Sequence, residues 1–284
     1  AMIQNVTRDE VVALLPRRRP DMHKGERGRL LAAGGSAQYP GAPSLSVQGA
    51  LRCGCGLVSL LSLPSVCAAC VARLPEAVCR PLEDPDEWLD VALSEASSFG
   101  AALLGPGLGR TEAAMRFVAG MWGRWPGPLL VDGDGLYALA LQGASCRLRE
   151  DVVLTPHEGE AARLLGTTPD AVRGDREGAA RRLAERWGCV LLKGHGSLLA
   201  CRGRSTVQRL TWGGPELAVP GSGDVLSGAI GAFMAGGMAP RDAALLGGAV
   251  HGMAGEWLAA GGVDGVLASE IADAMRLVLG ELRS

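Results

Sequence analysis

The sequence predicts an α/β fold, a three-layer α/β/α sandwich with a mostly parallel central sheet. Short apolar runs, typical of strands buried on both faces, alternate along the chain with segments of helical length and amphipathic pattern. Glycine, at 42 of 284 residues, gathers in short turns between these segments. No Pro/Ser-rich linker, long charge run or repeat interrupts the alternation. We therefore expect a single domain over residues 1–284, with Ala1, which precedes Met2, a residue left from expression.

The apolar runs place the expected strands in order along the chain. They are 29–33, 56–63, 77–80, 101–104, 129–132, 152–154 and 189–193, followed by a β-pair at 198–202 and 206–210. After a short amphipathic start at 11–15, helices are expected at 43–53, 86–97, 111–122, 135–141, 158–165, 175–187, 222–235, 240–259 and 269–282. Because ligands of open parallel sheets bind beyond the carboxyl ends of the strands, the residues after each strand are the candidates for a site.

The composition favours a small molecule as the binding partner of this protein. A formal charge of -2 and 4% aromatic residues give neither a basic face nor a stacking platform for nucleic acid. No apolar stretch reaches the roughly 20 residues that a membrane span needs, and no signal-peptide pattern opens the chain. We therefore expect no membrane partner and a cytoplasmic location.

The cysteines and histidines predict no metal site. Cys67-Ala-Ala-Cys70 has a chelating spacing, but Cys53-Gly-Cys55, the pair nearest to it, does not. The eight cysteines lie mostly among Ala, Val and Leu, so we expect structural buried thiols. The four histidines give no helix-spaced ligand pair.

The most specific pattern is Gly221-Ser222-Gly223-Asp224, at the start of the helix expected at 222–235. Two glycines beside an acid leave the amides of residues 222–224 open to a phosphate, which the helix dipole also attracts. A capping Asp alone would account for Asp224 but not for the glycines. We therefore expect phosphoryl transfer here, with Asp224 activating a substrate hydroxyl.

Five other strand ends carry weaker patterns, and the first four have a structural alternative. The glycine-rich stretches at 34–43 and 105–109 are ligand-approach sites or plain turns. Asp134 either caps the helix that follows it or belongs to the site. Thr155 and Glu158 fit a capping box, whereas His157 between them is placed to contact a polar ligand. Lys193, at the end of a strand, is a point cation able to neutralise phosphate.

As a set, these segments resemble the ADP- or ATP-dependent NAD(P)H-hydrate dehydratases of the ribokinase-like superfamily. The resemblance runs from about residue 23 to residue 256 and rests on the motifs GGS…YPGAP (34–43), GPGLG (105–109), VDGDGL (131–136), TPHEGE (155–160), KGHGS (193–197) and GSGDVLSG (221–228). It implies a ribokinase-like fold and the dehydration of (S)-NADHX or (S)-NADPHX, the hydrated nicotinamide cofactors, back to NADH or NADPH. ADP or ATP would be the phosphate donor, with Mg²⁺, and phosphate would be released with AMP or ADP.

The resemblance also implies roles for single residues. Asp224 would be the catalytic residue, and Ala42, Gly107, His157 and Asp224 would contact the hydrated dinucleotide. The expected nucleotide-binding residues are Lys193, Gly194, His195, Gly196, Ser197, Ser222 and Gly223, while no protein-only metal cage is expected. Family members suggest a homo-oligomer, commonly a tetramer. A partner NAD(P)HX epimerase would be a separate chain, because no epimerase domain precedes the dehydratase region.

This chain departs from the family pattern at three places. Residues 214–218 read Gly-Pro-Glu-Leu-Ala where Asn-Pro-Gly-Met-Ala is usual, Tyr137 stands where Asn is frequent, and TPHEGE replaces TPHPGE. Two alternatives therefore accompany the dehydratase. A ribokinase-like small-molecule kinase would use the same turn and Asp224, and a non-catalytic nucleotide-binding protein would bind without turnover.

Overall fold

The computed structural model describes residues 2–284, so that the interpretation of Ala1 lies outside the described residues. Strands of this part of the chain form one sheet in the order β1-β10-β9-β8-β7-β6-β5-β2-β3-β4. Their bounds are β1 Met2–Asn5, β2 Arg29–Ala33, β3 Leu57–Ser62, β4 Val78–Pro81, β5 Ala101–Leu104, β6 Leu129–Val131, β7 Val152–Leu154, β8 Cys189–Leu192, β9 Ser197–Cys201 and β10 Thr206–Leu210. Strand β9 runs antiparallel to β8 and β10, and the remaining neighbours are parallel. The predicted, mostly parallel sheet is confirmed.

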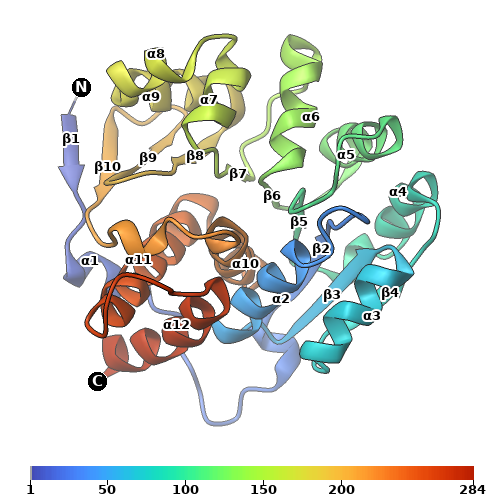
Figure 1. Cartoon of the computed structure of the whole chain (residues 1–284), viewed down its shortest axis with the longest axis horizontal. Helices are drawn as coiled ribbons and strands as arrows, with labels where there is room; N and C mark the ends of the chain where they lie inside the picture. Colours follow the sequence, from blue (N-terminus) through green and yellow to red (C-terminus); the bar gives the residue numbers. More distant parts are fainter. Residues whose placement is uncertain (1) are drawn as a thin grey trace.

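Helices cover both faces of this sheet (Figure 1). One face carries α2 Ala42–Arg52, α3 Pro64–Arg73, α10 Ser222–Ala235, α11 Pro240–Ala259 and α12 Ala268–Arg283, with the short α1 Arg8–Ala13 at its margin. The other face carries α4 Pro85–Ser94, α5 Glu112–Arg124, α6 Asp134–Gln142, α7 Glu158–Leu165, α8 Pro169–Gly174 and α9 Arg176–Trp187.

The buried strands supply side chains to both layers of the core. In β2, Leu30 and Ala32 join the cluster under α10 and α11, whereas Leu31 and Ala33 join the cluster under α4 and α5. All four side chains are buried. This alternation follows from the period-2 geometry of a strand, and it confirms the predicted three-layer sandwich.

Three elements differ from the sequence prediction. Strand β1 pairs with β10 at the edge of the sheet, and its side chains are largely exposed, so no apolar run marks it. Helix α3 begins at Pro64 and is rich in Ala, Val and Cys, whose uniform apolar character hides a helical period. Helix α8 has only six residues, and Thr168 caps it. Each is too short or too uniform for a periodicity argument to detect.

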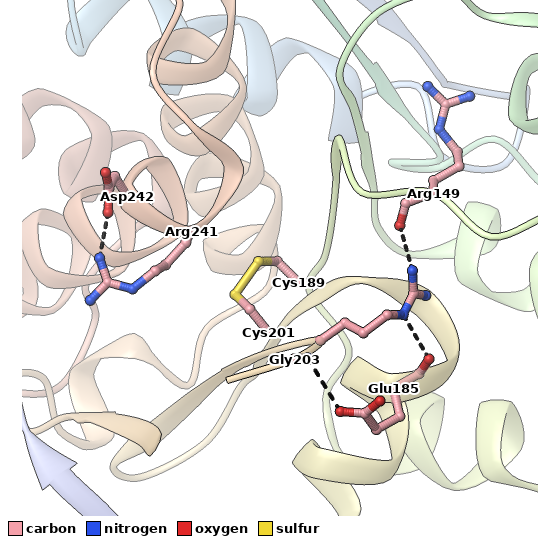
Figure 2. The surroundings of a disulfide bond; sticks show 8 residues. Arg149, Glu185, Cys189, Cys201, Gly203, Arg241 and Asp242 are labelled. Atoms are coloured by element: carbon pink, nitrogen blue, oxygen red, sulfur yellow. Dashed lines mark hydrogen bonds and ion pairs between the residues drawn. A yellow bond between two sulfur atoms is a disulfide. The ribbon is translucent and has the colours of Figure 1, made fainter. Parts of the chain in front are cut away.

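Two of the eight cysteines form a disulfide, which corrects the prediction of buried thiols for that pair. Cys189 at the start of β8 lies directly opposite Cys201 at the end of β9, with their Cα atoms 4.1 Å apart (Figure 2). Spacing along the chain does not reveal this pairing, because it depends on the register of the hairpin. Next to Cys201, Arg202 donates hydrogen bonds to the carbonyl oxygens of Glu185 and Arg149.

The other cysteines are free thiols, as predicted. Cys53, Cys55, Cys67, Cys70 and Cys146 are buried, and Cys79 is half-buried. Burial raises the pKa of Cys53 to about 12, so the thiol stays protonated. A search of residues 2–284 finds no helix with both the length and the apolar character that a membrane span requires.

Candidate active site

All but one of the strand ends that the sequence singled out open onto one cavity of about 880 Å³. The loops after β2, β5, β6 and β7 and the first turn of α10 contribute to its wall. Its lining includes Gln38, Tyr39, Ala42, Gly107, Gly109, Arg110, Gly133, Asp134, His157, Gly159, Glu160, Ala162, Arg163, Thr167, Pro169 and Asp224. The four residues that the resemblance assigned to the dinucleotide are therefore brought together.

The first turn of α10 has the open backbone that its sequence suggested. Gly221, before the helix, has φ of 86°, and a Cβ there would lie 2.3 Å from the side chain of Leu45. The amides of Gly223 and Asp224 have no hydrogen-bond acceptor among residues 2–284, whereas the amide of Ser222 donates to the carbonyl oxygen of Val219. Two free amides, instead of the expected three, therefore face a ligand at the helix N-terminus.

His251 of α11 holds Ser222 in place. The Nε2 atom of His251 lies 3.1 Å from the Ser222 hydroxyl and 3.0 Å from its carbonyl oxygen. Burial lowers the pKa of His251 to about 4, so the ring is neutral near pH 7. The hydroxyl, the amide and the carbonyl oxygen of Ser222 thus all contact protein, and the free groups of this turn are the amides of Gly223 and Asp224.

A buried ion pair lies under the turn. The Lys193 ammonium group is 3.0 Å from Asp132 Oδ1 and 4.0 Å from Glu160 Oε2. The Ser227 hydroxyl of α10 donates to the other oxygen of Asp132. A Cβ on Gly223 would lie 3.1 Å from the Lys193 nitrogen, so the bare Cα of Gly223 is what lets the amine approach the turn.

Charges and burial set the protonation of this cluster. Burial acts to lower the pKa of Lys193, but the carboxylates of Asp132, Glu160 and Asp224 outweigh it and raise that pKa above its ordinary value. Burial, with the neighbouring charge of Asp132, raises the pKa of Asp224 to about 7, against the opposing effect of Lys193. Burial also raises the pKa of Glu160 to about 7. Asp224 accepts no hydrogen bond from a side chain or amide of residues 2–284, so its carboxyl is free for a ligand.

The capping box that the sequence suggested at Thr155 and Glu158 is wrong. His157 caps α7 instead, because its Nδ1 accepts hydrogen bonds from the amides of Gly159 and Glu160 at 3.0 and 3.3 Å, and Glu160 accepts from the His157 amide. Thr155 is fully buried at the end of β7. Burial, followed by the charge of Lys193, lowers the pKa of His157. The ring therefore lines the cavity with Nδ1 unprotonated, and its Nε2 lies 3.4 Å from Glu160 Oε1.

One of the two interpretations of Asp134 was that it caps α6. This is wrong, because Gly133 occupies the cap position. The Asp134 carboxylate accepts hydrogen bonds from the amide of Gly109 and from Nε of Arg110, at 2.9 and 3.0 Å. Asp134 thus ties the 105–109 turn to the next strand loop. Sequence reasoning missed Asp132, Glu160 and Arg110, although the first two stand in motifs that it quoted.

The expected nucleotide-binding residues fall into two groups. Lys193 and Gly223 lie beneath the α10 turn. His195 and Gly196 line a second cavity of about 550 Å³, together with Arg176 and Arg209. Between the two groups the Ser197 hydroxyl donates to the carbonyl oxygen of Gly194, which closes the β8–β9 turn.

The unusual 214–218 loop has its own internal support. It contains the short helix η4, Pro215–Leu217, and the buried Glu216 accepts a hydrogen bond from the amide of Gly214. Within residues 2–284, no group of three or more His, Cys, Asp or Glu side chains is arranged to hold a metal ion.

Comparisons with known proteins identify the family of this chain. The family model described as NAD(P)H-hydrate dehydratase matches residues 30–277. The chain is 42% identical over 272 residues to the bifunctional NAD(P)H-hydrate repair enzyme Nnr of Thermanaerovibrio acidaminovorans, which covers 93% of this chain and 52% of that protein. It is 37% identical to the ADP-dependent (S)-NAD(P)H-hydrate dehydratase of Neisseria meningitidis, over 91% of this chain and 87% of that protein. The chain thus spans about half the length of the bifunctional relatives that it matches.

A solved structure extends the agreement to the whole fold. The ADP/ATP-dependent NAD(P)H-hydrate dehydratase of Bacillus subtilis, co-crystallised with ATP and Mg²⁺, superposes with a TM-score of 0.87 and is 30% identical. The match covers 97% of each chain. The expected ribokinase-like fold is confirmed.

Proposed function

Because the chain belongs to the NAD(P)H-hydrate dehydratase family, we propose that it returns (S)-NADHX or (S)-NADPHX to NADH or NADPH, with ADP or ATP as phosphate donor. Phosphate would be released with AMP from ADP, or with ADP from ATP. One observation carries the proposal: Asp224 lines the cavity beside the two open amides of the α10 turn. We treat the whole chain as one dehydratase domain.

The chemistry follows from the leaving group. Hydroxide leaves a carbon atom poorly, so the hydroxyl on C6 of the hydrated ring is first phosphorylated. Asp224 accepts the hydroxyl proton as the oxygen attacks the terminal phosphoryl group of the donor, and a pKa of about 7 suits a base that works near neutral pH. The free amides of Gly223 and Asp224 stabilise the charge on the transferred group. The ring nitrogen then expels phosphate with its lone pair, and loss of the C5 proton restores the dihydropyridine.

Two groups of residues support the binding of donor and substrate. Ala42, Gly107 and His157 would contact the dinucleotide, since they line the same cavity as Asp224. Lys193, the 194–197 turn and the free amide of Gly223 would hold the AMP portion of the donor, with Ser222 holding that turn in place. Mg²⁺ prefers donor phosphates plus one or two carboxylates, which fits a chain with no closed metal cage among residues 2–284. It would supply charge neutralisation on the transferred phosphate.

Further attributes rest on the family. We infer a cytoplasmic location, since the substrate and the donor are soluble dinucleotides and nucleotides. We also infer a homo-oligomer, with a tetramer as the working model. The bifunctional enzymes named as relatives suggest that an NAD(P)HX epimerase is a functional partner of this chain.

Product analysis of the purified protein with hydrated NADH and with hydrated NADPH tests the proposal. A dehydratase regains the absorbance of the reduced nicotinamide and releases one phosphate for each ring restored, with ADP or ATP present. Accumulation of a phosphorylated alcohol without absorbance recovery would favour the ribokinase-like kinase. Nucleotide binding with neither product would favour the non-catalytic nucleotide-binding protein.

A further inference from the structure

The wall of the main cavity carries two guanidinium groups stacked on one tyrosine. Arg110 places Cζ 4.2 Å from the centroid of the Tyr137 ring, and Arg163 places Cζ 5.1 Å from the same centroid. Both arginines line the cavity that Asp224 lines, and both are exposed at its outer part. Tyr137 stands in α6, so the stack joins α6 to the loop after β5 and to α7.

The two arginines differ in whether a carboxylate of the protein neutralises their charge. Nε of Arg110 donates to Asp134, so one carboxylate balances its charge. Arg163, in the last turn of α7, has no ion-pair or hydrogen-bond partner among residues 2–284. A stacking contact with an aromatic ring fixes a guanidinium without using its donors. The donors of Arg163 are therefore oriented by the ring and open to an anion.

The charges of the cavity are also segregated. The carboxylates of Asp132, Glu160 and Asp224 act on Lys193 beside the α10 turn, whereas the exposed Arg163 adds an unbalanced positive charge to the cavity wall. A substrate that suits such a cavity has an uncharged hydroxylated ring at one end and phosphate groups farther along. Planar guanidinium groups match phosphate oxygens with paired hydrogen bonds, which gives them an advantage over other cations.

We propose that Arg163, oriented by Tyr137 and assisted by Arg110, binds a phosphate group of the dinucleotide substrate. This inference rests on the proposed function, since it names the part of the same substrate that the exposed end of the cavity recognises. The phosphate belongs either to the pyrophosphate, which both hydrated cofactors carry, or to the 2′-phosphate, which only the hydrated NADPH carries.

Steady-state kinetics of Arg163→Gln with both hydrated cofactors test the proposal. We expect KM to rise roughly tenfold or more for at least one of them, with kcat little changed. A rise with both cofactors identifies the pyrophosphate, and a rise with hydrated NADPH alone identifies the 2′-phosphate. An unchanged KM with both would overturn the proposal.

Two matched variants separate phosphate binding from general effects. Arg73, in the last turn of α3, is also exposed and unpaired among the described residues but does not line the cavity, so Arg73→Gln should change neither KM. Tyr137→Phe keeps the aromatic face and should retain most of the affinity that Tyr137→Ala loses. Tyr137→Ala should reproduce part of the loss seen with Arg163→Gln, and a Tyr137→Phe variant as impaired as Tyr137→Ala would contradict the stacking role.

A binding measurement makes the test independent of turnover. Titration of NADH and NADPH, the reaction products, into wild type and Arg163→Gln by calorimetry should show the same pattern of lost affinity. If wild type turns over neither hydrated cofactor, the proposed function fails. Equal affinities of wild type and Arg163→Gln for both products would instead refute the role of Arg163.

Discussion

Replacing Asp224 by Asn should stabilise the protein, and should do so more strongly as the pH rises. Burial and the neighbouring carboxylates raise the pKa of Asp224 from 3.8 to about 7. Between those values the native carboxyl keeps a proton that the unfolded chain has released, so the stability of the wild type falls as the pH rises. The fall ends above about pH 7, where both states are ionised. Asn carries no charge at any of these pH values and escapes this loss.

The magnitude follows from the interval of pH that is compared. One pKa unit corresponds to about 1.4 kcal/mol, so from about pH 5 to above pH 7 the advantage of Asp224→Asn should grow by at most about 3 kcal/mol. This is an upper limit, because the cavity opens to water and solvent screens part of the charge. Glu160 titrates in both proteins, so only the part of its titration that depends on the charge of residue 224 enters the comparison.

Urea unfolding of ligand-free wild type and Asp224→Asn at about pH 5 and about pH 8 measures this difference. Asp90→Asn is the control, since Asp90 is exposed on α4 and has no ion pair among the described residues; its effect should be the same at both pH values. A stability difference between Asp224→Asn and wild type that does not change with pH would refute the raised pKa. The electrostatic argument for a base active near neutral pH would then lose its support.

Three further outcomes follow from the site and the disulfide. In Asp132→Asn, loss of the negative charge should lower the pKa of Asp224, so the rise of kcat/KM with pH should move to lower pH. A rise of kcat/KM at the same pH as in the wild type would contradict this. In Lys193→Ala, loss of the cation should move the same rise to higher pH. Calorimetry should show a larger loss of affinity for the donor than for the dinucleotide, and an equal loss for both would count against the assignment. Replacing Cys189 and Cys201 together by Ser should lower the free energy of unfolding by up to about 3 kcal/mol, because the disulfide closes a loop of 12 residues. A reductant should lower the stability of the wild type to the same level and leave that of the double variant unchanged.

The fold was predictable because its signals are local. Strand β2 is a continuous apolar run, which is what burial on both faces of a parallel sheet requires. The glycine turn before helix α10 and the apolar residues within it indicate this helix in the sequence. Strand β1 gave no such signal, since it lies at the edge of the sheet and its side chains are largely exposed.

The parts of the candidate site that lie within one motif could be predicted from the sequence. Contacts between segments far apart in the chain could not. Asp224 and its glycines are adjacent in sequence, so their arrangement at a helix N-terminus could be read directly. The pair of Lys193 with Asp132 joins residues 61 positions apart, and only the order of β6, β7 and β8 in the sheet brings them together. The Cys189–Cys201 disulfide was missed for the same reason, since it depends on the register of β8 and β9.

The rate of Asp224→Asn tests the central claim most directly. Wild type and variant are compared under single-turnover conditions, with hydrated NADH, a saturating donor and nicotinamide absorbance as the readout. A general base contributes about 10²- to 10⁴-fold, so the variant should be slower by that factor while its affinity for the donor stays the same. A variant that restores NADH at the wild-type rate would show that residue 224 takes no proton from the substrate hydroxyl.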